Sequence, residues 1–415
     1  MKKHQDQGGL KPEYASILDG FYRGLAPSGL SPDYRAETEV YRRRSRLASA
    51  GRLYESLMSA SGVAAGPRVG YFCNLVPEEL IRACGAVPVR LCELDHACAR
   101  LGEEVLPGDA CPMIKSICGS AAAGRYRDLD LLVIPAACDG KAKLSELLAP
   151  VRPVYLLDLP RSSEYLRNAD AWTGRYQDFF DFLKERFRSR AGRSELTAEC
   201  RRANLRTQLF RRLYHFRAGH PGLINHFDYF TLVSLSFRLE PEAWLDLAGE
   251  ILAEAVGRAE GLKFDGRRIL LAGSPIIFPA YKVLDILYEF NCEAVADSLC
   301  SGYGHLYDPV EIDEETETGI IRALALKYLA ASLCPCFMGL NKLLDLLVDT
   351  TAEYRLDGVI YHDLRLCQVF DMQTVAIRQV LKEKRIPFLS IKTDLGREDT
   401  GQLKTRIEAF LEMLG

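Results

Sequence analysis

Two stretches of this chain carry the same short pattern, in which a cysteine stands directly before a proline. The two pairs are Cys111-Pro112 and Cys334-Pro335. Proline is favoured at the first position of a helix, because the N–H group that it lacks would have no partner there. The pattern therefore predicts a helix start after each cysteine, where backbone N–H groups and the helix dipole favour a thiolate. We expect a third helix after Cys73, over residues 77–85, with proline and two acidic residues in its first turn.

The similarity continues downstream of both pairs. Cys138 follows the apolar run at residues 131–135, and Cys367 follows the apolar run at residues 358–361. Each half of the chain therefore has the same order: a helix that starts at a Cys-Pro pair, a buried strand, and a cysteine just past that strand. Strands that alternate with helices in this way predict a mostly parallel sheet in each half.

The length of the chain also favours two cores. At 415 residues it is too long for one ordinary hydrophobic core. The predicted fold class is α/β, with two pseudo-repeated Rossmann or flavodoxin-like domains joined by a helical spacer. We expect N-terminal helices over residues 1–62, the first α/β domain over 63–161, the spacer over 162–262 and the second α/β domain over 263–415.

Short apolar runs bounded by glycine, proline or charged residues mark the expected strands. In the first domain these runs are 68–73, 86–91, 130–134 and 153–157, and in the second they are 268–275, 293–297, 358–361 and 386–391.

Composition narrows the class of protein further. The net charge of −3 at pH 7 gives no reason to expect nucleic acid as a partner. No run of about 18 apolar residues predicts a membrane span. The N-terminus is polar and lacks an apolar signal core, so we expect a cytoplasmic protein.

The chain has 13 cysteines, which need an explanation in a protein of that compartment. A reducing cytosol argues against a disulfide framework. Structural zinc sites use pairs of cysteines two to four residues apart, whereas the close pair here, Cys334 and Cys336, has a single residue between its members. We expect Cys84, Cys200 and Cys292 to be buried hydrophobic residues.

Six of the cysteines lie at turns after predicted strands or before predicted helices. The strands of one parallel sheet end at a common edge, so three such loops can converge on one point. Three thiolates around a point suit an iron–sulfur cubane in which one iron lacks a cysteine ligand. The alternative is six independent thiols, and the internal repeat favours the cluster. The candidate ligands are Cys73, Cys111 and Cys138 in the first half and Cys300, Cys334 and Cys367 in the second.

Other residues compete for these roles or could assist them. Cys336 is an alternative to Cys334, and the first half has further cysteines at positions 92, 98 and 118. Lys141 and Lys143 could offset thiolate charge or could be solvated. The histidines near the proposed loops are His96, His305 and His362.

Four segments resemble a known family, the 2-hydroxyacyl-CoA dehydratase/benzoyl-CoA reductase superfamily. They are residues 70–81, 106–115, 357–361 and 405–414. Within that superfamily, the segment 138–143 together with the six cysteines resembles the double-cubane cluster proteins. No nucleotide-binding motif such as a P-loop occurs in the sequence.

The resemblance implies a function for the six cysteines. They would bind an [8Fe-9S] cluster, in which two cubanes are joined by a sulfide, in a homodimer that works under anaerobic conditions. A separate ATP-hydrolysing [4Fe-4S] activator would reduce this cluster to low potential, and the protein would then reduce a small-molecule substrate. One alternative is a 2-hydroxyacyl-CoA dehydratase subunit, in which three cysteines hold one [4Fe-4S] cluster. Another is a non-catalytic electron carrier. The sequence names neither the physiological substrate nor a catalytic side chain.

Overall fold

The computed structural model describes residues 11–25, 34–59, 65–91, 94–162 and 165–414. It confirms the predicted α/β class with two parallel sheets. The strands of the first sheet are β1 (Arg68–Tyr71), β2 (Val87–Arg90), β3 (Leu131–Pro135) and β4 (Val154–Leu157). Those of the second are β5 (Arg267–Gly273), β6 (Cys292–Asp297), β7 (Gly358–Leu364) and β8 (Phe388–Thr393).

The two sheets have the same strand order, which is the structural form of the repeat seen in the sequence. The order is β2–β1–β3–β4 in the first and β6–β5–β7–β8 in the second. All pairings are parallel. In each sheet the first strand, β1 or β5, lies inside the sheet, with the next strand in sequence on one side of it and the last two on the other. This is the doubly wound arrangement, in which ligands bind beyond the carboxyl ends of the strands where the winding reverses.

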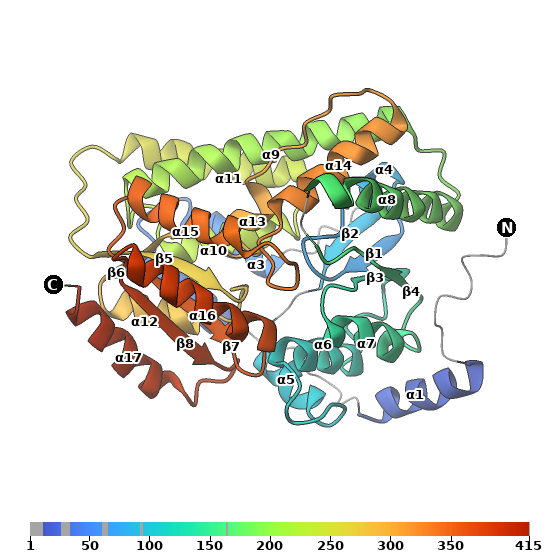
Figure 1. Ribbon diagram of the computed structural model, residues 1–415, viewed down its shortest axis with the longest axis horizontal. Coiled ribbons are helices and arrows are strands. Elements are labelled where there is room, and N and C mark those ends of the chain that lie inside the picture. Colours follow the sequence, from blue (N-terminus) through green and yellow to red (C-terminus); the bar gives the residue numbers. More distant parts are fainter. Residues whose placement is uncertain (1–10, 26–33, 60–64, 92–93, 163–164, 415) are drawn as a thin grey trace.

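Helices surround both sheets (Figure 1). The helices that precede the spacer in the sequence are α1 (Pro12–Leu25), α2 (Arg35–Arg44), α3 (Ala50–Ser59), α4 (Glu78–Ala83), α5 (His96–Gly102), α6 (Pro112–Ala122) and α7 (Asp139–Leu148). The spacer consists of α8 (Tyr165–Phe187), α9 (Arg193–Gly219), α10 (His226–Ser236) and α11 (Pro241–Gly257). The second half adds α12 (Lys282–Glu289), α13 (Tyr303–Leu306), α14 (Glu317–Ala331), α15 (Leu340–Glu353), α16 (Gln368–Glu383) and α17 (Thr400–Glu412).

The strand ends differ from the expectation where the backbone turns sharply. The first strand ends at Tyr71, because Cys73 has a φ of 77°, which no strand residue adopts. β5 ends at Gly273, where a Cβ atom would lie 2.0 Å from the carbonyl oxygen of His362, so the turn requires glycine. β7 continues to Leu364, three residues beyond the predicted run, and all of its residues are buried.

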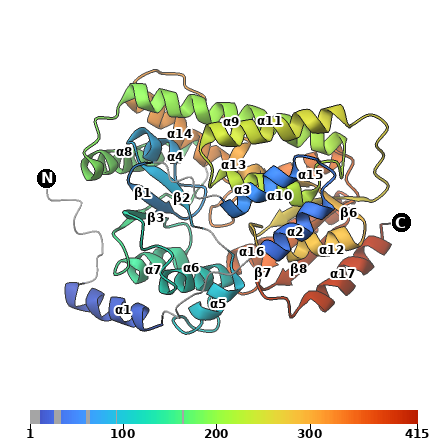
Figure 2. The same ribbon diagram turned by 180° about the vertical axis from the view of Figure 1, so that it is seen from behind.

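Each sheet is covered in part by helices from the other half of the chain. Leu53 of α3, near the N-terminus, belongs to the same buried cluster as Ile269 of β5. Conversely, Leu324 of α14 belongs to the same cluster as Val69 of β1, and α14 packs along α8. Figure 2 shows α2 and α3 lying over the second half of the molecule. The division of the chain into four consecutive domains therefore stays a prediction.

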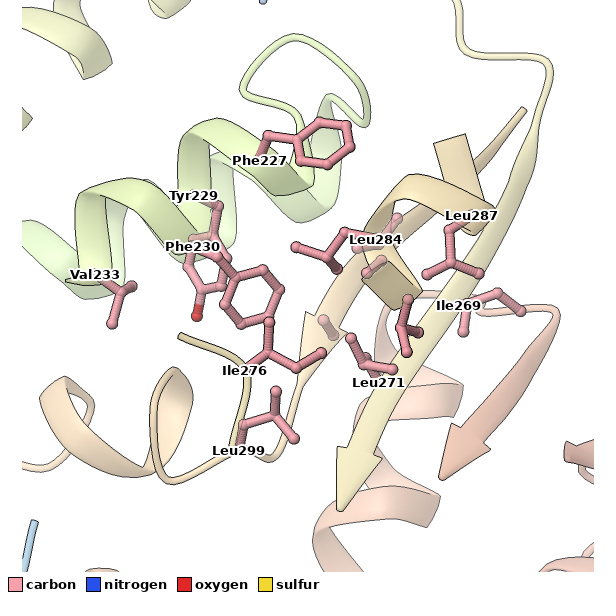
Figure 3. Packing of buried hydrophobic residues seen from close by; sticks show 14 of the residues in the cluster. Phe227, Tyr229, Phe230, Val233, Ile269, Leu271, Ile276, Leu284, Leu287 and Leu299 are labelled. Atoms are coloured by element: carbon pink, nitrogen blue, oxygen red, sulfur yellow. The ribbon is translucent and has the colours of Figure 1, made fainter. Parts of the chain in front are cut away.

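The largest core surrounds the second sheet. Phe227, Phe230 and Val233 of α10 belong to the same buried cluster as Ile269 and Leu271 of β5 (Figure 3). Burying a large apolar side chain contributes about 1.5–3 kcal/mol. This core fixes the sheet whose carboxyl edge carries half of the cysteine loops. Among the described residues, no helix combines the length and the apolar character needed to cross a membrane.

Candidate cysteine site

All six predicted cysteines line one cavity of about 300 Å³ between the two sheets. Its wall contains loops that follow the carboxyl ends of strands in both sheets. Cys73 follows β1, Cys138 follows β3, Cys300 follows β6 and Cys367 follows β7. Parallel strands therefore bring these thiols together as the sequence predicted, and whether they bind iron stays a prediction. A seventh cysteine, Cys336, lies in the same wall.

Three of the thiols lie at helix N-termini. Cys111, Cys138 and Cys367 are the N-cap residues of α6, α7 and α16. Backbone N–H groups of the first helical turn lie near each sulfur and favour a lower pKa of the thiol. Such N–H groups have no partner within the helix, so a thiolate at this position is stabilised by them and by the helix dipole.

The helix start predicted directly after Cys334 is wrong. Cys334 begins a tight turn, closed by a hydrogen bond of 3.0 Å from the N–H of Phe337 to its carbonyl oxygen. Pro335 occupies the second position of that turn, which suits its fixed φ as well as a helix start does. The next helix begins only at Leu340. The helix predicted after Cys73 is confirmed, since α4 begins at Glu78 with Pro77 as its N-cap.

Cys73 occupies an unusual backbone conformation. Its φ of 77° lies in the left-handed region, which costs a residue other than glycine about 1–2 kcal/mol. The side chain of Asn74 donates a hydrogen bond of 2.8 Å to the carbonyl oxygen of Gly304. The loop after β1 is therefore tied directly to the loop after β6, which carries Cys300.

The loop that carries Cys300 is built around the buried carboxylate of Asp297. This carboxylate accepts hydrogen bonds from the N–H groups of Leu299, at 2.9 Å, and Tyr303, at 3.0 Å. At Gly302 a Cβ atom would lie 2.2 Å from the same carboxylate, so the loop can close only around glycine. Asp297 was not singled out in the sequence, because its role depends on the path of the loop.

Neighbouring thiols form hydrogen bonds with one another in the cavity. The Cys367 thiol donates to Cys111, which lowers the pKa of Cys111 and raises that of Cys367. The single proton of the Cys336 thiol can be donated to either Cys138 or Cys334. These hydrogen bonds lower the pKa of Cys138 to about 6 and that of Cys334 to about 7, and they raise that of Cys336.

The thiols therefore meet across the halves of the chain as well as within the second half. Cys111 and Cys138, from the first half, contact Cys367 and Cys336, from the second. Burial raises the pKa of the Cys300 thiol to about 12. One site is thus made jointly by both halves.

The other described cysteines lie away from this cavity. Cys84 and Cys200 are buried in the core of the first sheet and Cys292 in the core of the second, as predicted. Cys98 and Cys118 are also buried and do not line the cavity. The remaining candidate, at position 92, lies outside the described residues.

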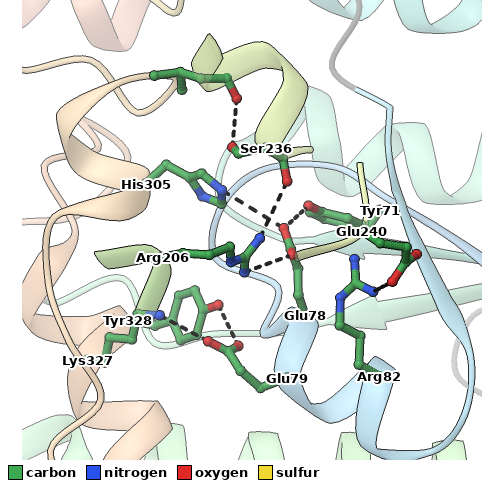
Figure 4. Close-up of polar contacts among 11 residues, drawn as sticks. Tyr71, Glu78, Glu79, Arg82, Arg206, Ser236, Glu240, His305, Lys327 and Tyr328 are labelled. Carbon is green, nitrogen blue, oxygen red and sulfur yellow. Dashed lines mark hydrogen bonds and ion pairs between the residues drawn. The ribbon is translucent and has the colours of Figure 1, made fainter. Parts of the chain in front are cut away.

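The three candidate histidines do not line the cavity either. His305 is buried beside a network of charges and faces Glu78, with 4.0 Å between its Nε2 and a carboxylate oxygen (Figure 4). Burial lowers the pKa of His305 and, to about 4, that of His362. His96 borders a neighbouring cavity of about 360 Å³. That cavity is walled by oppositely charged side chains and contains no cysteine.

The arrangement of the cavity thiols indicates whether they suit a single metal ion or an iron–sulfur cluster. In the part of the chain that the structure describes, no three His, Cys, Asp or Glu side chains come close enough to hold a single metal ion. Seven thiols instead surround a volume of about 300 Å³. In iron–sulfur clusters each cysteine binds a different iron, so the ligands are spread around the cluster. The residues present therefore fit a multinuclear iron–sulfur group better than a zinc ion.

Comparisons with known proteins agree with the resemblance seen in the sequence. A family model described as the 2-hydroxyglutaryl-CoA dehydratase D-component matches residues 73–414. The putative dehydratase subunit YjiM of Escherichia coli (strain K12) is 32% identical over 84% of this chain and 91% of its own length. Lactoyl-CoA dehydratase subunit beta of Anaerotignum propionicum is 21% identical over 83% of this chain and 91% of its own length. (R)-2-Hydroxyglutaryl-CoA dehydratase subunit beta of Acidaminococcus fermentans is 22% identical, with 83% and 92% covered.

Proposed function

Since this chain belongs to the 2-hydroxyglutaryl-CoA dehydratase D-component family, within the 2-hydroxyacyl-CoA dehydratase superfamily, we propose that it is an iron–sulfur reductase component with a double-cubane [8Fe-9S] cluster. The observation that carries the proposal is the meeting of all six predicted cysteines in one cavity. A site for a single cubane would need only three of them. When bound, a group of this kind supplies electrons at low potential.

The cysteines of both halves would hold this group together. The residues that we assign as ligands are Cys73, Cys111, Cys138, Cys300, Cys334 and Cys367. The N-termini of α6, α7 and α16 would stabilise the negative charge of three of these thiolates.

The rest of the wall would keep water away from the ligands. Met113, Ile114, Leu366 and Phe370 contribute apolar surface to the cavity. A dry, low-dielectric site strengthens the interaction of each thiolate with the N–H groups and charges around it. These side chains would therefore limit the access of water to the iron–sulfur group.

We further propose the partners that the resemblance implies. Because the sequence has no P-loop, a separate ATP-hydrolysing [4Fe-4S] activator would deliver electrons to this protein. The protein would act as a homodimer on a small-molecule substrate.

A second candidate function is supported by the names of two relatives. The dehydratases of Anaerotignum propionicum and Acidaminococcus fermentans match this chain over more than four fifths of its length. This chain would then be a 2-hydroxyacyl-CoA dehydratase subunit with one [4Fe-4S] cluster. A non-catalytic electron carrier is the third candidate.

Anaerobic iron and sulfide analysis of the purified protein separates the first two candidates. About eight irons per chain would support the double cubane, and about four would support the dehydratase. Cys138→Ser and Cys300→Ser should each lower the iron content, whereas the control Cys84→Ala should not, because Cys84 lies in the core of the first sheet. Full iron in both serine variants would refute the double-cubane proposal.

Turnover separates the reductase from the electron carrier. With the cognate activator and ATP, the protein should reduce a small molecule over many turnovers, and dithionite alone should reduce the cluster incompletely. Activity with a mild donor and no ATP would contradict the proposal.

A further inference from the structure

A single lysine side chain is buried in the wall of the cysteine cavity. Lys141 lies in the first turn of α7, three residues after Cys138, and is 9% exposed. Among the described lining residues, the other charged side chain is Asp139. Its carboxylate is 92% exposed and forms an ion pair of 2.9 Å with Arg161, so it belongs to the rim. Lys141 therefore provides the positive charge of the cavity itself.

The charge of Lys141 reaches thiols on three separate segments. Its ammonium group favours a lower pKa for Cys138, Cys334 and Cys336, although hydrogen bonds between thiols and burial have larger effects on these pKa values. It also favours a lower pKa for Cys300, although burial and other charged groups have larger effects there. These cysteines come from the loops after β3 and β6 and from the turn before α15. The lysine thus faces ligands contributed by both halves of the chain.

Burial of this lysine needs compensation by negative charge. Moving an ammonium group out of water is costly unless anions accompany it. Lys143, two residues later, shows the ordinary alternative: its side chain is 74% exposed and pairs with Glu146 at 3.0 Å. The thiolates of the cavity wall supply negative charge of this kind beside Lys141.

We propose that Lys141 is a positioning residue whose charge offsets the cavity thiolates and raises the reduction potential of the iron–sulfur group that they hold. This inference rests on the proposed function. An added electron increases the negative charge of the site, so a fixed cation close to it stabilises the reduced form. Lys141 therefore makes the group easier to reduce.

A second cation near the site, the guanidinium group of Arg90, is not changed by substitutions at position 141. The guanidinium group of Arg90 stacks on the ring of Phe237, 4.6 Å from the ring centre. It acts on Cys300 but does not line the cavity. Variants at position 141 therefore change the charge inside the cavity while the charge of Arg90 behind Cys300 is kept.

The test compares Lys141→Met, Lys141→Arg and the control Lys143→Met, all purified anaerobically. The first measurement is iron content, and the second is the midpoint potential from a redox titration followed by electron paramagnetic resonance. For Lys141→Met we expect full iron and a tenfold lower ratio of reduced to oxidised form at a fixed applied potential. That ratio corresponds to a midpoint about 59 mV more negative for one electron. Lys141→Arg and Lys143→Met should keep the wild-type midpoint.

Each outcome decides between this inference and others. An unchanged midpoint in Lys141→Met, or an equal shift in Lys143→Met, would overturn it. If Lys141→Met lost iron while Lys141→Arg kept it, charge would still be the required property. If both lost iron, the side chain would act through its shape and the inference would fail. Absence of iron from the wild-type protein would refute the proposed function instead.

Discussion

Replacing Arg206 with methionine should destabilise the contact between the spacer and the first sheet. Arg206 of α9 pairs with Glu78 of α4 at 3.5 Å, and the two side chains are 7% and 4% exposed (Figure 4). The carboxylate also accepts a hydrogen bond from the Tyr71 hydroxyl. Removing one partner of a buried ion pair costs about 3–5 kcal/mol when the other charge is left without compensation. Because Arg82 and the Tyr71 hydroxyl still stabilise the carboxylate, we expect Arg206→Met to lower stability by an amount near or below the lower end of that range.

The pH dependence of this effect has a definite sign. Burial raises the pKa of Glu78, but Arg206, Arg82 and the Tyr71 hydroxyl outweigh burial and keep the pKa below its usual 4.5. In the wild type the ionised carboxylate therefore contributes stability above the unfolded pKa of about 4.3 and loses it as the pH falls through the folded pKa. In Arg206→Met the pKa of Glu78 should rise. The deficit of the variant should be largest near neutral pH and smaller in acid, where Glu78 becomes neutral.

Hydrogen exchange of the α4 amides is a suitable assay, because a chain with two cores need not unfold in one step. The matched control is Arg202→Met, one turn earlier in α9. Arg202 is 49% exposed and pairs with Glu199, so its loss should cost about 0–1 kcal/mol. The double variant Glu78→Gln/Arg206→Met should cost less than the sum of the single variants. Additive losses, or equal effects of Arg206→Met and Arg202→Met, would refute the reasoning.

Three further predictions concern single side chains. Cys84→Ala should cost about 1 kcal/mol in thermal denaturation, because a small buried side chain is removed; a loss of several kcal/mol would contradict this. In reduced, iron-free protein the alkylation rate of Cys138, whose pKa is lowered to about 6, should hardly increase between pH 7 and 9. Cys118, whose pKa burial raises to about 12, should react far more slowly at pH 7, and mass spectrometry of the labelled peptides compares the two. Burial lowers the pKa of His362 to about 4, so the unfolded chain takes up a proton between about pH 6.5 and 4 that the folded chain does not. Stability should fall as the pH falls through that window, and His362→Gln should reduce the slope of the thermal midpoint against pH; an unchanged slope would show that His362 does not contribute.

The positions of the strands along the chain were predictable because apolar runs mark buried parallel strands. The runs at 131–135 and 358–361 became β3 and β7, the inner strands that are buried along their length. The two Cys-Pro pairs show the limit of local sequence. The φ of proline suits both a helix start and the second position of a turn, so one pair began α6 and the other formed a turn.

The convergence of the cysteine loops also followed from the sequence, since parallel strands end at a common edge. The burial of Lys141 and the equal access of Cys336 to the cavity could not be predicted. Both depend on how the two sheets face each other, which is a property of the packed halves. The same holds for Arg206 and Glu78, which are 128 residues apart in the chain.

Because each core contains helices from the other half of the chain, neither core can be completed until late in synthesis. The ribosome releases the N-terminal part first, yet the first core needs Leu324 of α14, far downstream. The second core needs Leu53, which is made early, and Phe410, which is made almost last. The strands of the first sheet must therefore wait with apolar surface uncovered while some 160 further residues, from β4 to α14, are translated. Any metal group held by the joint site can enter only when the chain is nearly complete.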